Sequence, residues 1–171
     1  SPSLSKDGSQ IAAIEQTDQQ KYNLVILQVD GRVLETVPSP GNRFIQHPCW
    51  MESDSAIVLA VSEEGGKSLF FYSAESGAWT RLFEAGMDDI SFPVVAGERI
   101  YFSATFSGID NIYCFDIKDQ ASYQVTSTRF GAFFPQLSKD GSVLYYSNYS
   151  ASGYGVASVK VEEGLWKPLA E

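Results

Sequence analysis

Four times along this chain, a proline opens a stretch that passes through a tight turn into an apolar strand. The four stretches are SPSLSKDGSQIAAIE, HPCWMESDSAIVLAV, FPVVAGERIYFSA and FPQLSKDGSVLYYSN, which begin at residues 1, 47, 92 and 134. Their prolines stand 46, 45 and 42 residues apart. The first and the fourth stretch share the turn Ser-Lys-Asp-Gly, which argues against a chance resemblance. One structural unit is therefore repeated along the whole chain.

Each repeat is interpreted as four short strands joined by turns, in which Asp and Gly supply the backbone dihedrals of a tight hairpin. The first strands are expected around Leu4, Trp50, Val94 and Leu137, and the most apolar second strands at residues 11–14, 57–61, 100–104 and 143–146. The third strands align at residues 23–31, 68–77, 111–120 and 155–164, and the fourth at residues 33–37, 79–83, 123–126 and 166–170. Pro168 in the last of these suits the edge of a sheet.

The length of the repeat indicates how these strands are arranged. A period in the low-to-mid forties that carries only strands is typical of a β-propeller. A four-stranded blade cannot bury its two faces alone, but stacking on its neighbours buries both, which explains the continuous apolar run at residues 56–61. We therefore expect an all-β fold, a β-propeller of four-stranded antiparallel blades. It forms one propeller segment over residues 1–171, with blades at about residues 1–46, 47–91, 92–133 and 134–171.

The chain starts in a first strand and ends in a fourth strand, so the repeat shows no offset between its two ends. We expect these four blades to belong to a larger ring of about six to eight blades. A complete four-bladed ring without strand exchange is the alternative. The first residues are Ser1 and Pro2 instead of Met, which leaves room for a leader or for further domains.

Charge limits the classes of partner. The chain has 12 basic and 21 acidic residues and a formal net charge of −9. Nucleic acid and anionic membrane surfaces require a basic footprint, so both are disfavoured as partners. No apolar run has the length of a transmembrane helix, and we expect no direct membrane insertion by this segment.

The repeat heads resemble a known family. SPSLSKDGSQIA and FPQLSKDGSVLYYS are similar to the WD-like Pro-Asp repeats of TolB-type propellers, which run Pro, an aromatic residue, Ser-Pro-Asp-Gly and then a strand. SGIDNIYCFDI in the third repeat is similar to the Asn-Ile-Tyr strand of the same family. The resemblance covers essentially the whole chain. The second repeat departs from it with MESDSA, the third shortens the turn to VVAGER, and Lys replaces the inner Pro in the first and the fourth.

A second resemblance concerns the placement of the protein. The stretch TSTRFGAFFPQLSKDGSVLYYSNYSASGYGVASV resembles propeller modules of Bacteroidetes-type envelope proteins. This resemblance implies a periplasmic or outer-membrane-associated protein in which the propeller is one module of a longer chain.

The sequence offers no catalytic constellation. His47 is the single histidine, and it precedes a proline in the position that Phe92 and Phe134 take in later repeats, so we expect a structural ring there and no general base. A Gly-x-Ser-x-Gly elbow is absent. Adjacent acidic pairs such as residues 88–89 lack the spacing of a calcium loop, and SEEGGK at residues 62–67 lacks the phosphate-loop pattern. We expect no catalytic residue, metal or cofactor.

Candidate binding residues lie on connecting loops. In a propeller, the loops after strand four share one face with the loops between strands two and three. On that face the sequence places Asn42, Arg43, Asp88, Asp89, Asp110, Arg129, Phe130, Tyr149 and Tyr154. Arg, Asp and exposed aromatic residues are the composition of a recognition surface, and loops on a rigid scaffold commonly carry function. Ordinary polar loops, with aromatic residues packed between blades, are the structural alternative.

Three functions fit these observations. The leading hypothesis is a non-catalytic scaffold and binding module for protein or peptide partners in the cell envelope, which itself is no enzyme. The alternatives are the substrate-gating propeller of a prolyl-oligopeptidase-like hydrolase, and a module that binds glycans or the cell wall through its aromatic loop residues. Other domains of the same chain are further expected partners.

Overall fold

The computed structural model describes residues 2–83, 86–162, 164 and 166–169. Parts of two expected strands, at Glu163 and Ala170, therefore lie outside the described residues. The strands are β1 Ser3–Leu4, β2 Gln10–Gln16, β3 Tyr22–Gln28, β4 Val33–Pro38, β5 Ile45–Trp50, β6 Ala56–Glu63, β7 Gly66–Ser73, β8 Trp79–Arg81, β9 Ile90–Ala96, β10 Arg99–Ala104, β11 Asn111–Asp116, β12 Ala121–Gln124, β13 Ala132–Leu137, β14 Val143–Ser150, β15 Gly153–Lys160 and β16 Lys167–Pro168.

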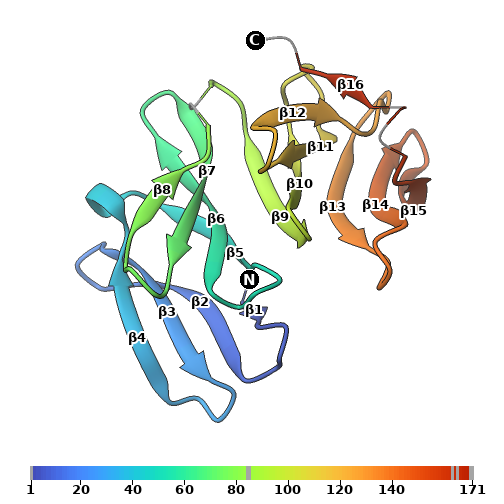
Figure 1. The fold of residues 1–171 in the computed structure, drawn as a ribbon. Helices are drawn as coiled ribbons and strands as arrows, with labels where there is room; N and C mark the ends of the chain where they lie inside the picture. Colours follow the sequence, from blue (N-terminus) through green and yellow to red (C-terminus); the bar gives the residue numbers. More distant parts are fainter. Residues whose placement is uncertain (1, 84–85, 163, 165, 170–171) are drawn as a thin grey trace. The chain divides into compact units, whose positions relative to one another are not determined.

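These strands form four antiparallel sheets, which Figure 1 shows as successive colours along the chain. The first sheet has the order β1-β2-β3-β4 and the second β5-β6-β7-β8, and both lie in a compact unit, Ser1–Met87. The third sheet is built on β9 to β12 and the fourth is β13-β14-β15, and both lie in the second unit, Asp88–Glu171. The expected all-β fold of antiparallel propeller blades is confirmed.

One turn of 3-10 helix, η1 (Pro40–Asn42), follows β4. Gly41 and Asn42 both adopt positive φ there, at 64° and 55°. Glycine and asparagine tolerate this conformation better than other residues, so the sequence Pro-Gly-Asn suits the bend. Nowhere in the described part of the chain does a helix have the length and apolar character needed to cross a membrane.

The Ser-Lys-Asp-Gly turns owe their shape to the aspartate. The carboxylate of Asp7 accepts hydrogen bonds from the Ser5 hydroxyl at 2.7 Å and from the Ser9 backbone N–H at 2.9 Å. Asp140 makes the same two contacts with the serines that flank its own turn, at 2.6 and 3.1 Å. An aspartate that bonds the backbone two residues ahead stabilises a tight turn locally. The repeated motif therefore has a structural role.

The second repeat keeps this turn although it lacks the Asp-Gly pair. Asp54 adopts a φ of 52° at the position where Gly8 has 74°. Its carboxylate accepts the backbone N–H groups of Lys6 and Asp7 from the first repeat, at 2.7 and 2.9 Å. Asp54 thus shapes its own turn and also holds the turn of the neighbouring sheet within the first unit.

The residue before the proline has a left-handed backbone in three repeats. His47, Phe92 and Phe134 have φ values of 51°, 54° and 53°. Each lies where the register of the first strand shifts against the second, as a β-bulge requires. Because bulky residues rarely adopt positive φ, this shared conformation shows that the three positions are structurally equivalent. The expectation that His47 takes the position of the later phenylalanines is confirmed.

Apolar side chains hold the sheets of each unit face to face. In the first unit, Leu24 and Ile26 of the first sheet pack in one cluster with Leu59 and Tyr72 of the second. In the second unit, the core joins residues of the third sheet to residues of the fourth, with Tyr101, Ile112, Cys114, Ala132, Leu144 and Trp166 buried. Stacked sheets bury the apolar faces that a single blade would expose.

Burial differs between the sheets. The residues at 57–61 in β6 and all residues of β11 are buried. This explains why their strands are continuously apolar. In β15, by contrast, every residue is at least partly exposed. The fourth sheet is therefore covered on one face.

The last strand does not lie where its repeat predicts. Residues 166–170 were expected as the fourth strand of the fourth blade, but Lys167–Pro168 pairs with Tyr123–Gln124 of β12. Figure 1 shows β16 beside β12, which makes the third sheet five-stranded in the order β16-β12-β11-β10-β9. The expected edge position of Pro168 is confirmed, but in the neighbouring sheet. We attribute the pairing of Lys167–Pro168 with the third sheet to the contacts of Trp166.

Trp166 is anchored in the third sheet. Its ring lies 6.0 Å from the rings of both Tyr101 and Tyr123, and the Arg99 guanidinium lies 5.4 Å from its ring centre. Burying an indole among two aromatic rings and a cation stabilises this position through apolar area and ring electrostatics. The chain after Trp166 then reaches the open edge of β12.

Candidate binding surface

Asn42 lies in the first unit and holds two loops together. Its side-chain oxygen accepts the backbone N–H of Tyr22 at 3.2 Å, and its side-chain nitrogen donates to the Gln20 carbonyl at 3.2 Å. Both groups of the amide are thus engaged with the β2–β3 loop. The side chain predicted for binding has a local structural role in this unit.

Arg43 is also engaged within the first unit. Its guanidinium lies 2.9 Å from the carboxylate of Glu63, whose side chain is largely buried. The same carboxylate pairs with Arg81 at 2.7 Å and accepts the Ser68 hydroxyl at 2.9 Å. A buried carboxylate needs such compensation, because leaving it unpaired is costly. Arg43 therefore ties the loop after η1 to the second sheet.

In the second unit, Asp88 and Asp89 meet Thr105 beside the β10–β11 loop. The Thr105 hydroxyl donates to the Asp88 carboxylate at 3.3 Å and accepts the Asp89 backbone N–H at 3.0 Å. Asp110 closes the same loop, and burial together with the nearby charge of Asp89 raises the pKa of Asp110. Three predicted acidic residues thus lie close together. Within the described residues, no three His, Cys, Asp or Glu side chains are grouped so as to hold a metal ion.

Asn111 organises the segment that leads to the next predicted residues. Its buried side-chain oxygen accepts the Thr126 hydroxyl at 3.0 Å and both the N–H and the hydroxyl of Thr128, at 2.8 and 3.2 Å. The sequence analysis did not select Asn111 as a site residue. The signal was an asparagine that opens an otherwise apolar strand, since a buried polar side chain there needs partners. Its bonds fix the loop immediately before Arg129.

Exposed aromatic rings gather at the start of the fourth sheet. The Arg129 guanidinium lies 5.3 Å from the ring centre of Phe130, which is 47% exposed. Tyr149 and Tyr154 face each other across the β14–β15 hairpin with ring centres 4.8 Å apart, and Tyr154 is 69% exposed. The ring of Phe133 lies 6.1 Å from that of Tyr154. Surface residues of this kind dominate binding energy in protein interfaces.

Seven of the predicted residues lie at one end of the third and fourth sheets. Backbone bonds connect this end, because the Ala132 N–H donates to the Asp110 carbonyl at 2.8 Å and the Tyr149 N–H donates to the Gly131 carbonyl at 2.9 Å. We call this set the loop surface: Asp88, Asp89, Asp110, Arg129, Phe130, Tyr149 and Tyr154. Asn42 and Arg43 lie in the other unit.

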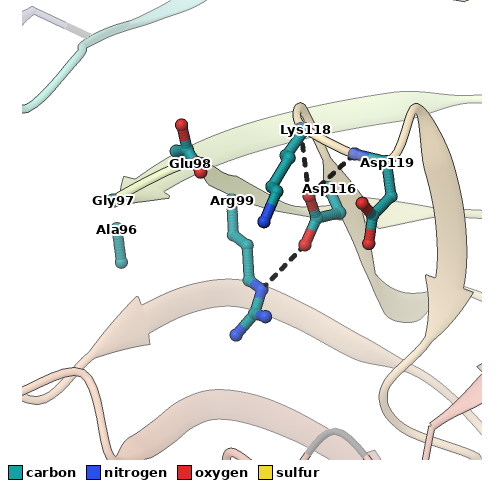
Figure 2. A pocket seen from close by; sticks show the side chains of 7 residues that line it. All are labelled: Ala96, Gly97, Glu98, Arg99, Asp116, Lys118 and Asp119. Carbon is teal, nitrogen blue, oxygen red and sulfur yellow. Dashed lines mark hydrogen bonds and ion pairs between the residues drawn. The ribbon is translucent and has the colours of Figure 1, made fainter.

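A charged cleft lies at the opposite ends of the third-sheet strands, between the β9–β10 and β11–β12 turns. Its volume is about 420 Å³, and Figure 2 shows the residues that line it, which are Ala96, Gly97, Glu98, Arg99, Asp116, Lys118 and Asp119. The sequence analysis placed no site there, because it interpreted both segments as hairpin turns. The signal was the density of charge in GER and DIKD around these turns.

Asp116 organises the charged cleft. Its carboxylate accepts the Arg99 Nε–H at 3.2 Å and the backbone N–H groups of Lys118 and Asp119 at 3.0 and 3.3 Å. Burial raises the pKa of Asp116, but these three hydrogen bonds outweigh it and leave the pKa below its ordinary value. The carboxylate is therefore ionised at neutral pH. Figure 2 shows the Lys118 ammonium directed into the cleft beside it.

The comparisons with known proteins give structural relatives. No protein-family model matches the chain, and no curated protein sequence matches it. The fold is similar to that of TolB from Acinetobacter baumannii, with a TM-score of 0.78 and 16% identity over 99% of this chain and 42% of that one. A protein assigned as TolB from Agrobacterium tumefaciens gives a TM-score of 0.77 and 18% identity over 96% of this chain and 62% of that one.

Peptidases are also among the structural relatives. A puromycin-hydrolyzing peptidase from Mycobacterium tuberculosis gives a TM-score of 0.74 and 15% identity over 99% of this chain and 28% of that one. The chain thus spans less than two thirds of the length of these solved structures. At such identities the likeness concerns the fold alone. The chain has the fold of a TolB-type β-propeller module, the fold also found in the propeller domains of prolyl-oligopeptidase-like proteins.

Proposed function

We propose that this chain is a non-catalytic binding module that captures protein or peptide partners through its loop surface. The observation that carries the proposal is the exposure of Phe130, Tyr149 and Tyr154 at one end of the fourth sheet, beside the cation of Arg129. Aromatic side chains and arginine are the residues that most often dominate the energy of protein interfaces. The acidic residues of the loop surface add complementarity to a basic segment.

The surface is also held in place, which favours binding. Asn111 fixes the loop before Arg129 through three accepted hydrogen bonds, and the β14–β15 hairpin carries the tyrosines. Pre-ordered side chains lose less conformational entropy when a partner arrives. The likeness to TolB supports a place for such a module in the cell envelope, in the periplasm or at the outer membrane.

A second candidate function rests on the peptidase relatives. Because peptidases share this fold and are much longer than this chain, the module could serve as the substrate-gating propeller of a hydrolase. A parent gene without a hydrolase domain would exclude this function. The two candidates therefore differ in a feature that the complete open reading frame reveals.

The test compares the capture of partner proteins after substitutions in the loop surface with their capture after a control substitution in the charged cleft. The wild-type chain, the double variant Arg129→Ala with Phe130→Ala, and the control Lys118→Ala are immobilised and exposed to an envelope extract, and the bound proteins are quantified by mass spectrometry. We expect the double variant to lose at least about tenfold of the specifically bound protein, which corresponds to about 1.4 kcal/mol. The control retains its capture, and all three chains unfold at similar temperatures.

Equal capture by the wild type and the double variant would contradict the proposal. A loss of folding in the double variant would contradict the assignment of these side chains to the surface, since exposed loop substitutions usually change stability by about 0.5 kcal/mol or less.

A further inference from the structure

Four aromatic side chains of the second unit lie together at the start of the fourth sheet. The rings of Tyr149 and Tyr154 are 4.8 Å apart and those of Phe133 and Tyr154 are 6.1 Å apart. The strand register places these three rings on one face of the sheet. Phe130 lies beside them, because the Tyr149 N–H donates to the carbonyl of the next residue, Gly131, at 2.9 Å. We call the four residues the aromatic patch: Phe130, Phe133, Tyr149 and Tyr154.

A glycine gives the aromatic patch a fixed base. Gly131 has a φ of 153°, and a Cβ at this position would lie 2.6 Å from the Phe133 ring. The half-buried Phe133 ring therefore packs directly on the backbone at Gly131, which a larger residue would prevent. Tyr149 and Tyr154 remain 42% and 69% exposed beside this base. The patch thus presents exposed rings that are already in contact with one another.

The two tyrosines also offer hydrogen-bond donors. The buried tyrosines Tyr72 and Tyr113 donate their hydroxyls to Glu35 and Ser107. Within the part of the chain that the structure describes, the hydroxyls of Tyr149 and Tyr154 have no such protein partner. Apolar ring faces and phenol donors therefore lie side by side. This combination suits a polyproline II segment, which has apolar rings and a backbone whose carbonyls make no internal hydrogen bonds.

The local charge beside the aromatic patch is mainly negative. The Asp110 carbonyl accepts the Ala132 N–H at 2.8 Å, which places this aspartate next to Gly131. Burial, with the charge of Asp89 as a second cause, raises the pKa of Asp110, so a cation beside its ionised carboxylate would be stabilising. Arg129 makes no ion pair among the described residues, and its guanidinium lies over the Phe130 ring. The carboxylates of the loop surface outnumber this one cation: Asp88, Asp89 and Asp110.

We propose that the aromatic patch binds a proline-rich segment in the polyproline II conformation that carries an arginine next to its prolines. The proposal rests on the proposed function and names the chemical class of the partner. The prolines pack on the exposed rings, the hydroxyls of Tyr149 and Tyr154 donate to peptide carbonyls, and the arginine pairs with Asp110. A polyproline II segment is already extended in solution, so it loses little conformational entropy on binding.

The local charge distinguishes this occupant from two others. A neutral glycan could stack on the rings, but it would leave the Asp110 carboxylate without a cation. A second copy of the chain, related by a two-fold axis, would bring two sets of the same carboxylates together, which is unfavourable. We therefore assign the patch to the arginine-containing peptide and treat the other two occupants as outcomes that overturn the assignment.

The test uses a capped proline peptide of about seven residues with one arginine near its end. Chemical shifts of the isotope-labelled chain are followed by NMR with the peptide at up to about 1 mM. We expect saturable shift changes at Gly131, Tyr149 and Tyr154. A peptide with alanine in place of every proline is expected to bind at least about tenfold more weakly. Citrulline, the neutral analogue of arginine, is expected to weaken binding about threefold.

Matched variants assign the tyrosine hydroxyls. The double variant Tyr149→Phe with Tyr154→Phe keeps both rings and removes both donors, so we expect peptide binding to weaken about tenfold. The control Tyr22→Phe removes a hydroxyl in the first unit and is expected to bind the peptide like the wild type. Exposed substitutions of this kind usually change stability by about 0.5 kcal/mol or less, and thermal unfolding of the three chains checks it.

A double-variant cycle assigns the charge. Asp110→Asn is expected to weaken binding of the arginine peptide about threefold and to leave binding of the citrulline peptide unchanged. An equal effect of Asp110→Asn on both peptides would contradict the pairing of Asp110 with the arginine.

Three further results would overturn the proposal, and none depends on a variant that folds. The first is the absence of shift changes at the aromatic patch with the peptide at about 1 mM. If the variant with Arg129→Ala and Phe130→Ala still loses protein capture, this result leaves the proposed function intact. The second is equal binding of the alanine peptide, or shift changes with an N-acetylglucosamine oligosaccharide and none with the peptide. The third is shift changes at the patch that grow with protein concentration in the absence of peptide, which would indicate a second copy.

Discussion

The third and fourth sheets lie side by side in one unit. Both are built from the same sequence repeat, but they differ in their number of strands. Within the described residues, the third sheet has five strands and every residue of its β11 is buried, whereas the fourth has three strands and every residue of its β15 is at least partly exposed. The difference in strand number involves one short segment, Lys167–Pro168, which pairs with the third sheet instead of the fourth. The repeat thus predicts which strands form, while the contacts of individual side chains determine which sheet β16 joins.

The anchor is Trp166, and its removal gives the largest expected effect on this comparison. Trp166→Ala deletes a buried ring between Tyr101 and Tyr123, so we expect a loss of about 3 kcal/mol or more in the free energy of unfolding. Denaturant titration measures the loss. Tyr146→Ala, a half-buried aromatic residue of the fourth sheet, is the control and should cost less. A loss below about 1 kcal/mol for Trp166→Ala would contradict its role as the anchor.

The same substitution in both sheets sharpens the comparison. Val95 in the third sheet is 3% exposed, and Val156 in the fourth is 86% exposed. We expect Val95→Ala to cost about 2 kcal/mol, because it removes buried methyl groups, and Val156→Ala to change stability by about 0.5 kcal/mol or less. Denaturant titration of the two variants gives the difference directly. Equal losses would mean that the face carrying Val156 is covered in solution.

The Asp-Gly turn of the fourth sheet predicts a smaller, pH-dependent effect. The hydroxyl of Ser138 and the N–H and hydroxyl of Ser142 lower the pKa of Asp140 to about 2. Because the folded pKa lies below the ordinary value of 3.8, the stabilisation is present above pH 3.8 and is lost as the pH falls through about 2. Asp140→Ala should therefore be less stable than the wild type at pH 7, with a gap that narrows from pH 4 to pH 2. Thermal unfolding across this range tests it, and a gap independent of pH would contradict it.

The smallest expected effect is a gain in stability, whereas the substitutions above lower stability. It concerns Asp110, beside the third sheet. Burial and the charge of Asp89 raise the pKa of Asp110, so ionised Asp110 opposes folding at neutral pH. Stability from this group is complete below its unfolded pKa and is lost as the pH rises through the raised folded value. We expect Asp110→Asn to gain at most about 0.5 kcal/mol at pH 7, since Asp110 is only partly buried and solvent screens its interaction with Asp89. The gain should vanish at pH 3, and thermal unfolding at the two pH values measures it. A destabilised variant at pH 7 would contradict this account.

Much of the fold could be predicted from the sequence. The proline-headed repeat located the strands, and the apolar run of β6 indicated burial on both faces. These features are local, because hairpin turns and strand patterns depend on neighbouring residues. The pairing of Lys167–Pro168, by contrast, does not depend on neighbouring residues in the sequence. It depends on where Trp166 finds partners, and Arg99 and Tyr101 lie more than sixty positions earlier in the sequence.

The sequence predicted at which end of the sheets the candidate residues lie, because strand topology determines this. Alternation of strand direction places Asp110, Arg129 and Tyr149 at one end of their sheets. It does not reveal which loop side chains are engaged, as Asn42 is with the backbone of Tyr22. Nor does it reveal the charged cleft, because its polar contacts form when the two turns fold together around Asp116.

The most direct test of the contrast between the two sheets is native-state amide hydrogen exchange of the isotope-labelled chain without any ligand. The N–H of Leu169 donates to the Ser122 carbonyl at 2.9 Å, which continues the pairing of β16 with β12. We predict slow exchange for Leu169 and fast exchange for Val156 and Ser158 on the open edge of β15. Fast exchange at Leu169 together with slow exchange at Val156 and Ser158 would indicate that β16 pairs with β15 in the fourth sheet. This result would contradict the pairing of β16 with β12.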